Sequence, residues 1–281
     1  MAKIAVIGIC GNSVFMYADH FHSKGETLVA EECFEEIGGK GINQAIACAR
    51  MGAEVSFLGA IGDDSDGEKC RNTAKENNLK DFLVAKKGKR TTFAFILTDK
   101  NGENRVTEYV GAELEVEDVL AFQKEIANSD FLLLQHEVPD EVNEAAVEIA
   151  KRHNVKVILN PAPIREISDS IAENVYIVTP NEQEKTAINP KRFANVVTTL
   201  GDKGCMVNEE AFIPALKVKA VDTTGAGDTF NGVLAVCLAD GMDLESACKY
   251  AVTASGLSVT KPYVLNSIPQ KNEIEEKLLS E

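Results

Sequence analysis

Short apolar segments recur along the chain and alternate with segments of helical periodicity. The apolar segments are rich in β-branched residues and cover residues 3–9, 55–61, 131–136, 155–160, 175–179 and 196–200. Strands that are apolar on both faces are typical of parallel sheets, because helices cover such sheets on either side. The pattern therefore predicts a parallel sheet buried in the middle of the protein.

The intervening segments repeat apolar residues three and four positions apart, as expected for helices that bury one face. They cover residues 42–51, 66–78, 116–127 and 140–153. Regular alternation of strands and helices predicts an α/β fold with a doubly wound, mostly parallel sheet and helices on both faces. Residues 225–240 and 244–259 form two consecutive helical segments, which we expect to cover the end of the sheet.

Two segments, residues 26–36 and 91–110, break this alternation with strand-like patterns. The second contains the Asn-Gly turn at 100–103 that is typical of a β-hairpin. A sheet this small has no core of its own, so we expect the two segments to pack together as a small antiparallel β lid over a cleft. A surface hairpin with no lid role is the alternative. No linker-like stretch divides the chain, and residues 1–281 are expected to form a single domain with this lid.

The composition limits the classes of partner. The chain has 281 residues, of which 44 are acidic and 29 are basic, for a net charge of −15. This charge argues against nucleic acid, whose binding depends largely on Lys and Arg contacts to phosphate. The longest apolar runs are far shorter than the roughly 20 residues that span a membrane, and the chain starts with a strand pattern rather than a signal peptide. We therefore expect a cytoplasmic protein that binds neither nucleic acid nor membrane.

Residues 221–232, VDTTGAGDTFNG, place two glycines directly before a helical apolar pattern. Backbone N–H groups in the first turn of a helix have no partner within the helix, and the helix dipole attracts anions. Gly225, Ala226 and Gly227 leave room for a phosphate group to approach these N–H groups. The segment is therefore predicted to form an anion hole.

Asp228 follows this anion hole in the first helical turn. A dinucleotide site of the Gly-x-Gly-x-x-Gly type is excluded, because Phe230 occupies the third glycine position and Asp228 would lie beside the pyrophosphate. A carboxylate here can accept the proton of a substrate hydroxyl while the N–H groups hold a transferring phosphoryl group. It can equally do no more than complement the helix dipole, and the spacing alone leaves both roles open.

Residues 38–44, GGKGINQ, form a second glycine-rich segment before a helix. The spacing differs from that of a Walker A loop, so ATP would have to be held in another way. The exposed backbone at Gly39, the charge of Lys40 and the paired donor and acceptor of Asn43 suit a site for a polyhydroxylated molecule. A plain strand-to-helix turn is the alternative.

These two segments, GGKGINQAIACARMGAEVSFLGAIGDD and VDTTGAGDTFNG, resemble the paired signatures of the ribokinase-like (phosphofructokinase B type) carbohydrate kinase family. Shorter blocks resemble the family in the same order along the chain: GET at 25–27, QHE at 135–137, NPAP at 160–163, TPNE at 179–182 and TLG at 199–201. The resemblance spans essentially the whole chain and is closest to the ribokinase branch. It implies ATP-dependent phosphorylation of a hydroxymethyl group on a small sugar or sugar-like substrate.

The resemblance also implies roles for the matching residues. Asp228 is the expected catalytic base, next to the anion hole of Gly225, Ala226 and Gly227. The sugar-contacting positions correspond to Gly39, Lys40, Asn43 and Glu137. The positions that contact the nucleotide and hydrated magnesium correspond to Asn181, Glu184, Thr199 and Gly201, together with Gly227. Asp222 and Thr224 match part of a site for a monovalent cation. ATP and Mg²⁺ are thus the implied cofactors, with K⁺ as a possible third.

The sugar site departs from the family pattern at Ser13, where the family has an Asp that grips the sugar. Ser offers one short hydroxyl in place of a charged acceptor with two oxygens, so a pair of adjacent hydroxyls is held less well. We therefore expect a substrate other than ribose, with Asn12, Phe15 or Met16 helping to shape the pocket.

Two further departures concern the nucleotide side. Between Glu184 and Thr199 a helix usual in the family is missing, which accounts for much of the modest length. Residues 261–264, KPYV, replace a Gly-Ala pair of the family's cation loop and put activation by K⁺ in question.

Two other functions stay open from the sequence. A nucleoside kinase of the same family is one, because the loss of an Asp at Ser13 weakens the preference for a free sugar. A noncatalytic sugar-binding protein on the same fold is the other, although such a protein has no physical reason to keep the anion hole beside Asp228. A homodimer through the lid is also expected, formed by an apolar face that includes Phe93, Phe95 and Leu97.

Overall fold

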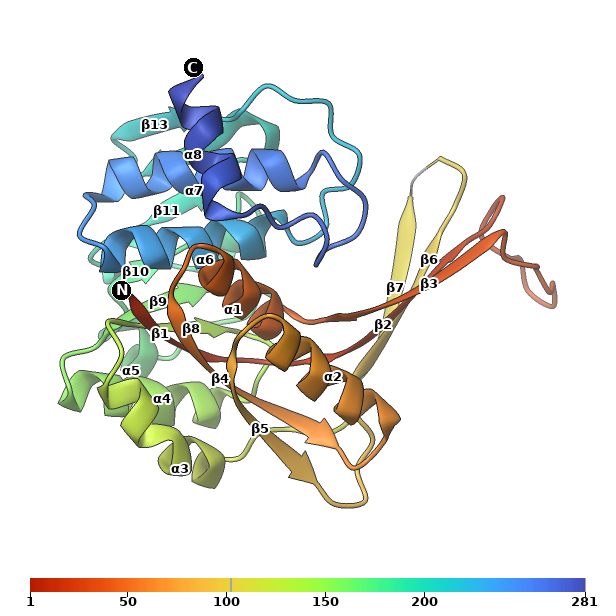
Figure 1. Cartoon of the computed structure of the whole chain (residues 1–281), viewed down its shortest axis with the longest axis horizontal. Helices are drawn as coiled ribbons and strands as arrows, with labels where there is room; N and C mark the ends of the chain where they lie inside the picture. The colour runs from red at the N-terminus through yellow and green to blue at the C-terminus, as the bar shows by residue number, and fades with distance from the viewer. Residues whose placement is uncertain (102, 281) are drawn as a thin grey trace.

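A computed structural model describes residues 1–101 and 103–280, and these include a six-stranded parallel sheet, whose strands are labelled in Figure 1. The strand order is β10-β9-β8-β1-β4-β5. The strands are β1 Lys3–Ile7, β4 Glu54–Gly62, β5 Lys80–Lys86, β8 Phe131–Gln135, β9 Lys156–Asn160 and β10 Ile177–Val178. The predicted parallel sheet is confirmed. Strand β5 was not predicted; it lies at the edge of the sheet, and of its seven residues only Leu83 is buried.

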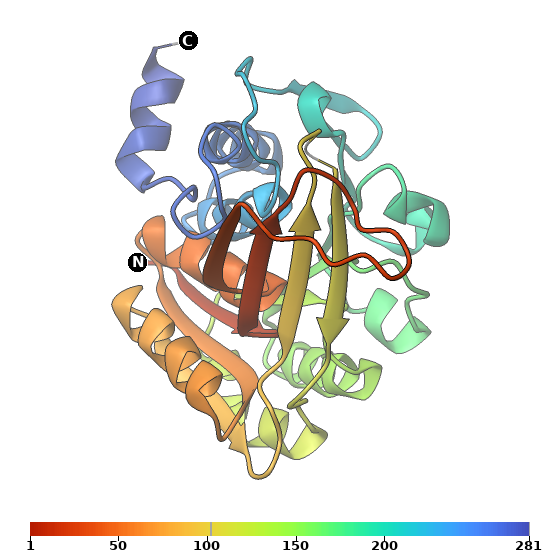
Figure 2. The ribbon, with the colours of Figure 1, turned by 90° about the vertical axis from the view of Figure 1, so that its right-hand side faces the viewer.

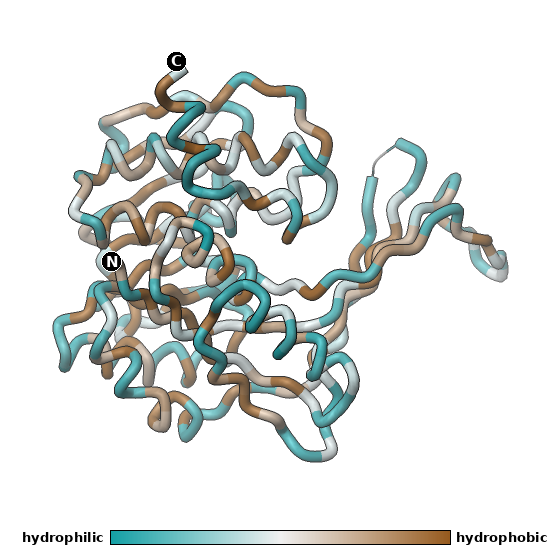
Figure 3. The backbone as a smooth tube through the Cα atoms, in the orientation of Figure 1, coloured by the Kyte–Doolittle hydropathy of each residue, from teal (hydrophilic) through white to brown (hydrophobic). Residues whose placement is uncertain are grey.

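Helices cover both faces of this sheet, as predicted. In β1, Ile4 and Val6 point to one hydrophobic cluster and Ala5 and Ile7 to the other. The first cluster packs under α1 Lys40–Arg50, α2 Ser65–Glu76, α6 Ala226–Ala239, α7 Leu244–Ser258 and α8 Lys271–Leu279. The second packs under α3 Val116–Ala127, α4 Asp140–Arg152 and α5 Asp169–Ala172. Hydrophobic and hydrophilic stretches alternate along these helices in Figure 3, as expected for helices with one buried face.

The segment after β10 differs from the expectation for residues 196–200. Val196 forms an isolated parallel bridge to Val178 of the main sheet, but the strand that follows it, β11 Val197–Thr199, pairs antiparallel with β12. With β12 Gly204–Val207 and β13 Ala211–Pro214 it forms a separate three-stranded sheet. Before β11, in the stretch where we expect a helix usual in the family to be missing, the chain makes two short 3₁₀ helices, η1 Glu184–Ala187 and η2 Pro190–Arg192. A third, η3 Gly201–Lys203, follows β11.

The lid is a four-stranded sheet that stands apart from the main sheet, with its strands side by side in Figure 2. Its order is β3-β2-β6-β7, from β2 Gly11–Tyr17, β3 Glu32–Gly38, β6 Phe93–Thr98 and β7 Asn104–Tyr109. The predicted small sheet is confirmed, and its outer pairs are antiparallel, while the central pair of β2 and β6 is parallel. Strand β2 was not predicted. At the predicted turn of 100–103, Gly102 lies outside the described residues.

Pairing in the lid places side chains in rows across the strands. Ser13 lies opposite Glu36 on one side and Ala94 on the other, and Ala94 lies opposite Glu108. Because side chains alternate along a strand, residues two positions apart share this face. The lid therefore presents Glu36, Ser13 and Glu108 in one row toward the main body.

Across residues 1–101 and 103–280, no helix combines the length and apolar content needed to cross a membrane.

Helix α6 packs closely on α1 at Gly232, which generates a test of the fold. A Cβ atom at Gly232 would lie 2.5 Å from the Cβ of Ala47 and 2.7 Å from the carbonyl oxygen of Gln44. We expect Gly232→Val to lower the free energy of unfolding by about 2 kcal/mol or more, because backbone atoms of α1 cannot move aside. Urea denaturation measures this change, with Ala121→Val at an exposed position of α3 as control. Equal effects of the two variants would show that the helices do not pack this closely.

Candidate functional site

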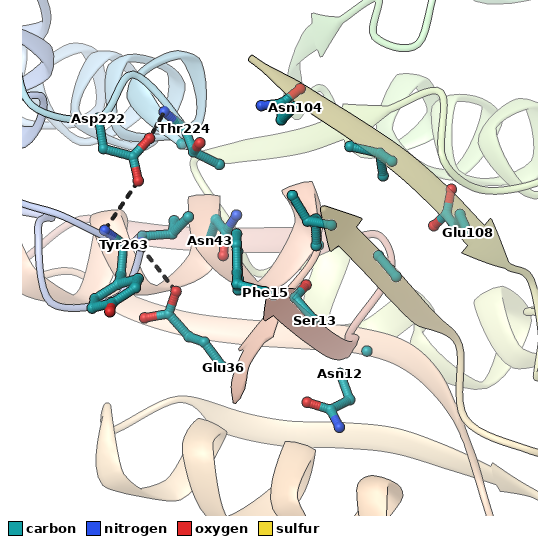
Figure 4. Close-up of a pocket in the computed structure, with 18 of the residues that line it drawn as sticks. Asn12, Ser13, Phe15, Glu36, Asn43, Asn104, Glu108, Asp222, Thr224 and Tyr263 are labelled. Atoms are coloured by element: carbon teal, nitrogen blue, oxygen red, sulfur yellow. Dashed lines mark hydrogen bonds between the residues drawn. The ribbon is translucent and has the colours of Figure 1, made fainter. Parts of the chain in front are cut away.

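A cavity of about 620 Å³ lies between the lid and the main body (Figure 4). The lid contributes Ser13, Phe15 and Glu108 to its wall. The main body contributes residues from the start of α1, the segment after β8 and the start of α6: Gly39, Lys40, Asn43, Glu137, Gly225 and Asp228. This location, outside the carboxyl ends of β1 and β8, is where the strand order of the sheet reverses, and ligands of α/β sheets commonly bind at such a point.

Asp228 lies in the first turn of α6 and is 6% exposed. The Asn43 Nδ2 atom donates to Asp228 Oδ2 at 2.9 Å, and the Gln44 Nε2 atom donates to Asp228 Oδ1 at 3.1 Å. Burial raises the pKa of Asp228, while Lys40 and the two amide donors act in the opposite direction. The carboxyl group is therefore a better proton acceptor than a solvent-exposed Asp and is held in one orientation.

The start of α6 has the geometry of an anion hole. Gly225 is the N-cap residue with a φ of 74°, a left-handed conformation that favours glycine. At Gly227, no atom from other parts of the described chain lies within 4 Å of the position that a Cβ would occupy. Backbone N–H groups of this turn can therefore be approached by the oxygens of a phosphoryl group.

Lys40 and Glu137 lie together at the start of α1. The backbone N–H of Lys40 donates to Glu137 Oε2 at 2.7 Å. Burial raises the pKa of Glu137 to about 8, because Lys40 offsets only part of the cost of a buried charge. Burial disfavours the charged form of Lys40, but Asp228 and Glu137 outweigh this effect and raise the pKa of Lys40. One lysine thus lies in the field of two carboxyl groups.

Gln44 is a site residue to which the sequence analysis assigned no role. Besides Asp228, it contacts Asn160 Oδ1 through Nε2 at 3.3 Å, and its Oε1 atom accepts from Gln135 Nε2 at 2.8 Å. These amides come from α1, β8 and β9, so their network joins three elements beneath Asp228. The adjacent Asn43 and Gln44 in the glycine-rich segment were the available signal, because two neighbouring side-chain amides can donate to the two oxygens of one carboxylate.

Three of the four lid residues named from the sequence line the cavity. Ser13 lines the cavity and is half-buried, and Asn12 and Phe15 also contribute to the wall. Met16, which we expected among the residues that shape the pocket, is not part of the cavity wall. Glu108 was missed by the sequence analysis; it acts electrostatically on both Lys40 and Glu137. Only the register with β6 reveals that it faces the cavity.

The expected nucleotide residues form a second group next to the cavity. The backbone N–H and the side-chain amide of Asn181 donate to Glu184 Oε2 and Oε1, both at 2.9 Å, and the Glu184 N–H donates back to Asn181 Oδ1 at 2.7 Å. Thr199 is bridged to Asn181, and Gly201 begins η3 after it, with a φ of 59°. Burial raises the pKa of Glu184, an effect that the charge of Lys40 partly offsets.

Asp222 and Thr224 lie just before the anion hole. Asp222 Oδ1 accepts from the Thr224 N–H at 2.9 Å, and Asp222 Oδ2 accepts from the Tyr263 N–H at 3.1 Å. Each carboxylate oxygen has a second lone pair for another partner, and oxygens of this kind are the ligands that a hard cation takes. Within the part of the chain that the structure describes, no group of three or more His, Cys, Asp and Glu side chains is placed to hold a metal ion.

Comparison with known proteins gives a consistent result. Residues 1–271 match the sequence model of the pfkB family of carbohydrate kinases. A ribokinase of Bacillus subtilis is 33% identical over 293 residues, covering 99% of this chain and 100% of the relative. The crystal structure of a ribokinase from Thermotoga maritima has a TM-score of 0.90 at 34% identity, covering 99% of this chain and 100% of that chain. A ribokinase of Arabidopsis thaliana, solved with ribose and ATP, has a TM-score of 0.87 at 24% identity, covering 99% of each chain.

The raised pKa of Glu137 generates a prediction about pH and stability. The folded protein binds more protons at Glu137 than the unfolded chain between its ordinary pKa of 4.5 and about 8. The contribution of this residue to stability is therefore complete below pH 4.5 and is lost as the pH rises through about 8. We expect the Tm of the wild type, relative to Glu137→Gln, to fall between pH 5 and pH 9, as thermal unfolding in the absence of ligands can measure. Glu141→Gln, at an exposed position, is the control, and its Tm should follow that of the wild type across this pH range. If the Tm of Glu137→Gln also followed that of the wild type, or if Glu141→Gln differed from the wild type as much as Glu137→Gln does, the assignment would be contradicted.

Proposed function

Because this chain belongs to the pfkB family of carbohydrate kinases, we propose that it transfers the γ-phosphoryl group of ATP to a hydroxymethyl group of a small sugar or sugar-like molecule, with Asp228 as general base. The observation that carries this proposal is the position of Asp228. It is a buried carboxyl group with a raised pKa, fixed by two amides and adjoining a helix terminus that suits an anion.

The proposed reaction is a direct transfer. Asp228 accepts the proton of the sugar hydroxyl as the hydroxyl oxygen forms a bond to the γ-phosphorus. The bond between that phosphorus and the oxygen bridging to the β-phosphate breaks, and ADP leaves with the electron pair. The N–H groups of Gly225, Ala226 and Gly227 stabilise the charge on the phosphoryl oxygens, and positioning of this kind supplies most of the catalysis in phosphoryl transfer.

The second group of residues suits the nucleotide. Asn181, Glu184, Thr199 and Gly201 are proposed to bind ATP and the water shell of its Mg²⁺, with Gly227 against the γ-phosphate. Carboxylate and amide oxygens suit hydrated magnesium, which neutralises phosphate charge when bound. A monovalent cation at Asp222 and Thr224 would add positive charge beside the anion hole, and this site remains a prediction.

The sugar site combines donors and acceptors around the cavity. Lys40 donates, and Glu137, with a pKa of about 8, can donate as well as accept near neutral pH. Asn43 has a side-chain oxygen with no hydrogen-bond partner among the described residues, so it is available to a hydroxyl. With backbone at Gly39, these groups suit several hydroxyls of one small molecule.

The lid is proposed to exclude water, which would otherwise accept the phosphoryl group. A homodimer through the lid remains a prediction, and Phe93, Phe95 and Leu97 are half-buried within one chain.

Asp228→Asn tests the base directly. Asn preserves size and can still interact with the amides, but it cannot accept the proton, so kcat should fall roughly 10² to 10⁴-fold. Sugar-dependent ADP release measures the rate, and circular dichroism checks the fold. Asp240→Asn, at the other end of α6, is the matched control and should retain wild-type turnover. Unchanged turnover in Asp228→Asn would remove it from the role of base.

Ser13 generates a prediction about the substrate. A screen of pentoses, hexoses and nucleosides with ATP and Mg²⁺ should identify a substrate with a higher kcat/KM than ribose. Ser13→Asp should shift the ratio of kcat/KM values toward ribose by about 10-fold or more, because it restores a charged acceptor for adjacent hydroxyls. Ribose as the best substrate of the wild type would contradict this account. Nucleosides as the best substrates would instead favour the nucleoside kinase.

A further inference from the structure

Glu36 is a buried carboxyl group in a strand whose other acidic residues are exposed. It lies near the end of β3 and is 9% exposed, whereas Glu32 and Glu35 face solvent. Its two oxygens accept backbone N–H groups of one loop: Glu36 Oε2 accepts from Val264 at 2.9 Å, and Oε1 accepts from Leu265 at 2.8 Å. Burial of a carboxylate is costly unless both oxygens are bonded. These two hydrogen bonds thus connect lid strand β3 to the loop of residues 261–265.

Aromatic contacts join the same loop to the lid. The Tyr263 ring stacks on Phe34 with ring centroids 3.8 Å apart and an interplanar angle of 20°, and its edge meets Phe15 at 6.3 Å. Tyr263 has a φ of 66°, a left-handed conformation that is uncommon for a non-glycine residue and persists only where surrounding contacts hold it. Glu36, Phe34 and Phe15 supply such contacts from two lid strands.

The other side of the loop contacts the N-cap residue of α6 and the turn that precedes it; Figure 4 shows the second contact, from Tyr263 to Asp222. The side chain of Val264 lies against Gly225, where an added Cβ would be 2.4 Å from Val264 Cγ1. The Tyr263 N–H donates to Asp222, whose second oxygen accepts from the Thr224 N–H. The loop therefore restrains both the N-cap residue of α6 and the turn that precedes it.

We infer that Glu36 is a positioning residue for phosphoryl transfer, which holds the loop of residues 261–265 so that the N–H groups at Gly225–Gly227 keep their place. The inference rests on the proposed function for its effect on rate. Donors act on a transition state only where its charge develops, and a displacement of about 1 Å can lower a rate by about 10²-fold. Since β3 also leads through Gly38 and Gly39 to Lys40, one strand connects the sugar side of the cavity with the phosphoryl side.

Kinetics of Glu36→Ala and Glu36→Gln test this role. We expect kcat at saturating ATP and sugar to fall roughly 10 to 100-fold in Glu36→Ala, and less in Glu36→Gln, which keeps one oxygen for a loop N–H. KM for the sugar should stay within about twofold, because Glu36 does not bind the sugar in this account. Glu31→Ala, an exposed residue just before β3, is the control. A wild-type kcat in Glu36→Ala, or a loss carried by KM alone, overturns the inference.

Hydrogen exchange tests the same link without catalysis. In Glu36→Ala, the amides of Val264 and Leu265 should exchange about 10-fold faster or more, and peptides covering residues 225–228 should also exchange faster. Glu31→Ala should match the wild type. Unchanged exchange at both segments overturns the link. If exchange changes as expected but the wild type phosphorylates no sugar or nucleoside, the physical link stands and the proposed function fails.

Discussion

The site depends on keeping one carboxyl group, that of Asp228, both buried and fixed. A buried carboxyl group is reactive as a base because it is poorly solvated, and it is costly for the same reason. The chain meets this constraint by packing α6 directly against α1, at Gly232, so that Asn43 and Gln44 reach the two carboxylate oxygens. Much of the surrounding structure can be understood as support for that contact.

The support extends in layers from Asp228. Side-chain amides of β8 and β9 form hydrogen bonds with Gln44. Glycines also let the start of α1 lie close to the end of β1, since a Cβ at Gly41 would lie 2.7 Å from the backbone of Gly8. On the other side, the loop of residues 261–265 bears on Gly225 and is fastened to the lid by Glu36. The lid and the two glycine-rich turns are therefore parts of one assembly, although they are distant in sequence.

Charge in this protein acts locally. The net charge of −15 would repel a nucleotide at long range, and the cavity itself carries several carboxyl groups around Lys40. In the proposed function, Lys40, the N–H groups at the start of α6 and the magnesium that accompanies ATP would offset this repulsion within a few ångströms, where fields in a poorly solvated site are strong. The net acidic charge is therefore mainly a property of the outer surface, where it affects solubility, and does not decide which ligand the cavity binds.

The sequence predicted the positions of helices and strands better than it predicted which strands pair with one another. Apolar periodicity indicated the parallel sheet, the helices on both faces and the two glycine-rich helix starts, because these signals are local. Strand β2 and the cavity-facing positions of Glu36 and Glu108 were missed, since the lid is assembled by the pairing of β2 with β6, two strands that are far apart in the chain. The segment at 196–200 was assigned to the parallel sheet because a short apolar run does not specify the direction of its neighbour.

The central claim is that Asp228 faces the reacting hydroxyl while the start of α6 faces the phosphoryl group. The most direct measurement is a crystal structure of the wild-type chain with its sugar substrate, ADP, Mg²⁺ and aluminium fluoride as a mimic of the transferring phosphoryl group. The account predicts a sugar hydroxyl within about 3.2 Å of an Asp228 oxygen, and fluorides of the mimic directed at the N–H groups of Gly225, Ala226 and Gly227. A sugar whose hydroxyls all lie away from Asp228, or a mimic bound away from α6, would contradict it.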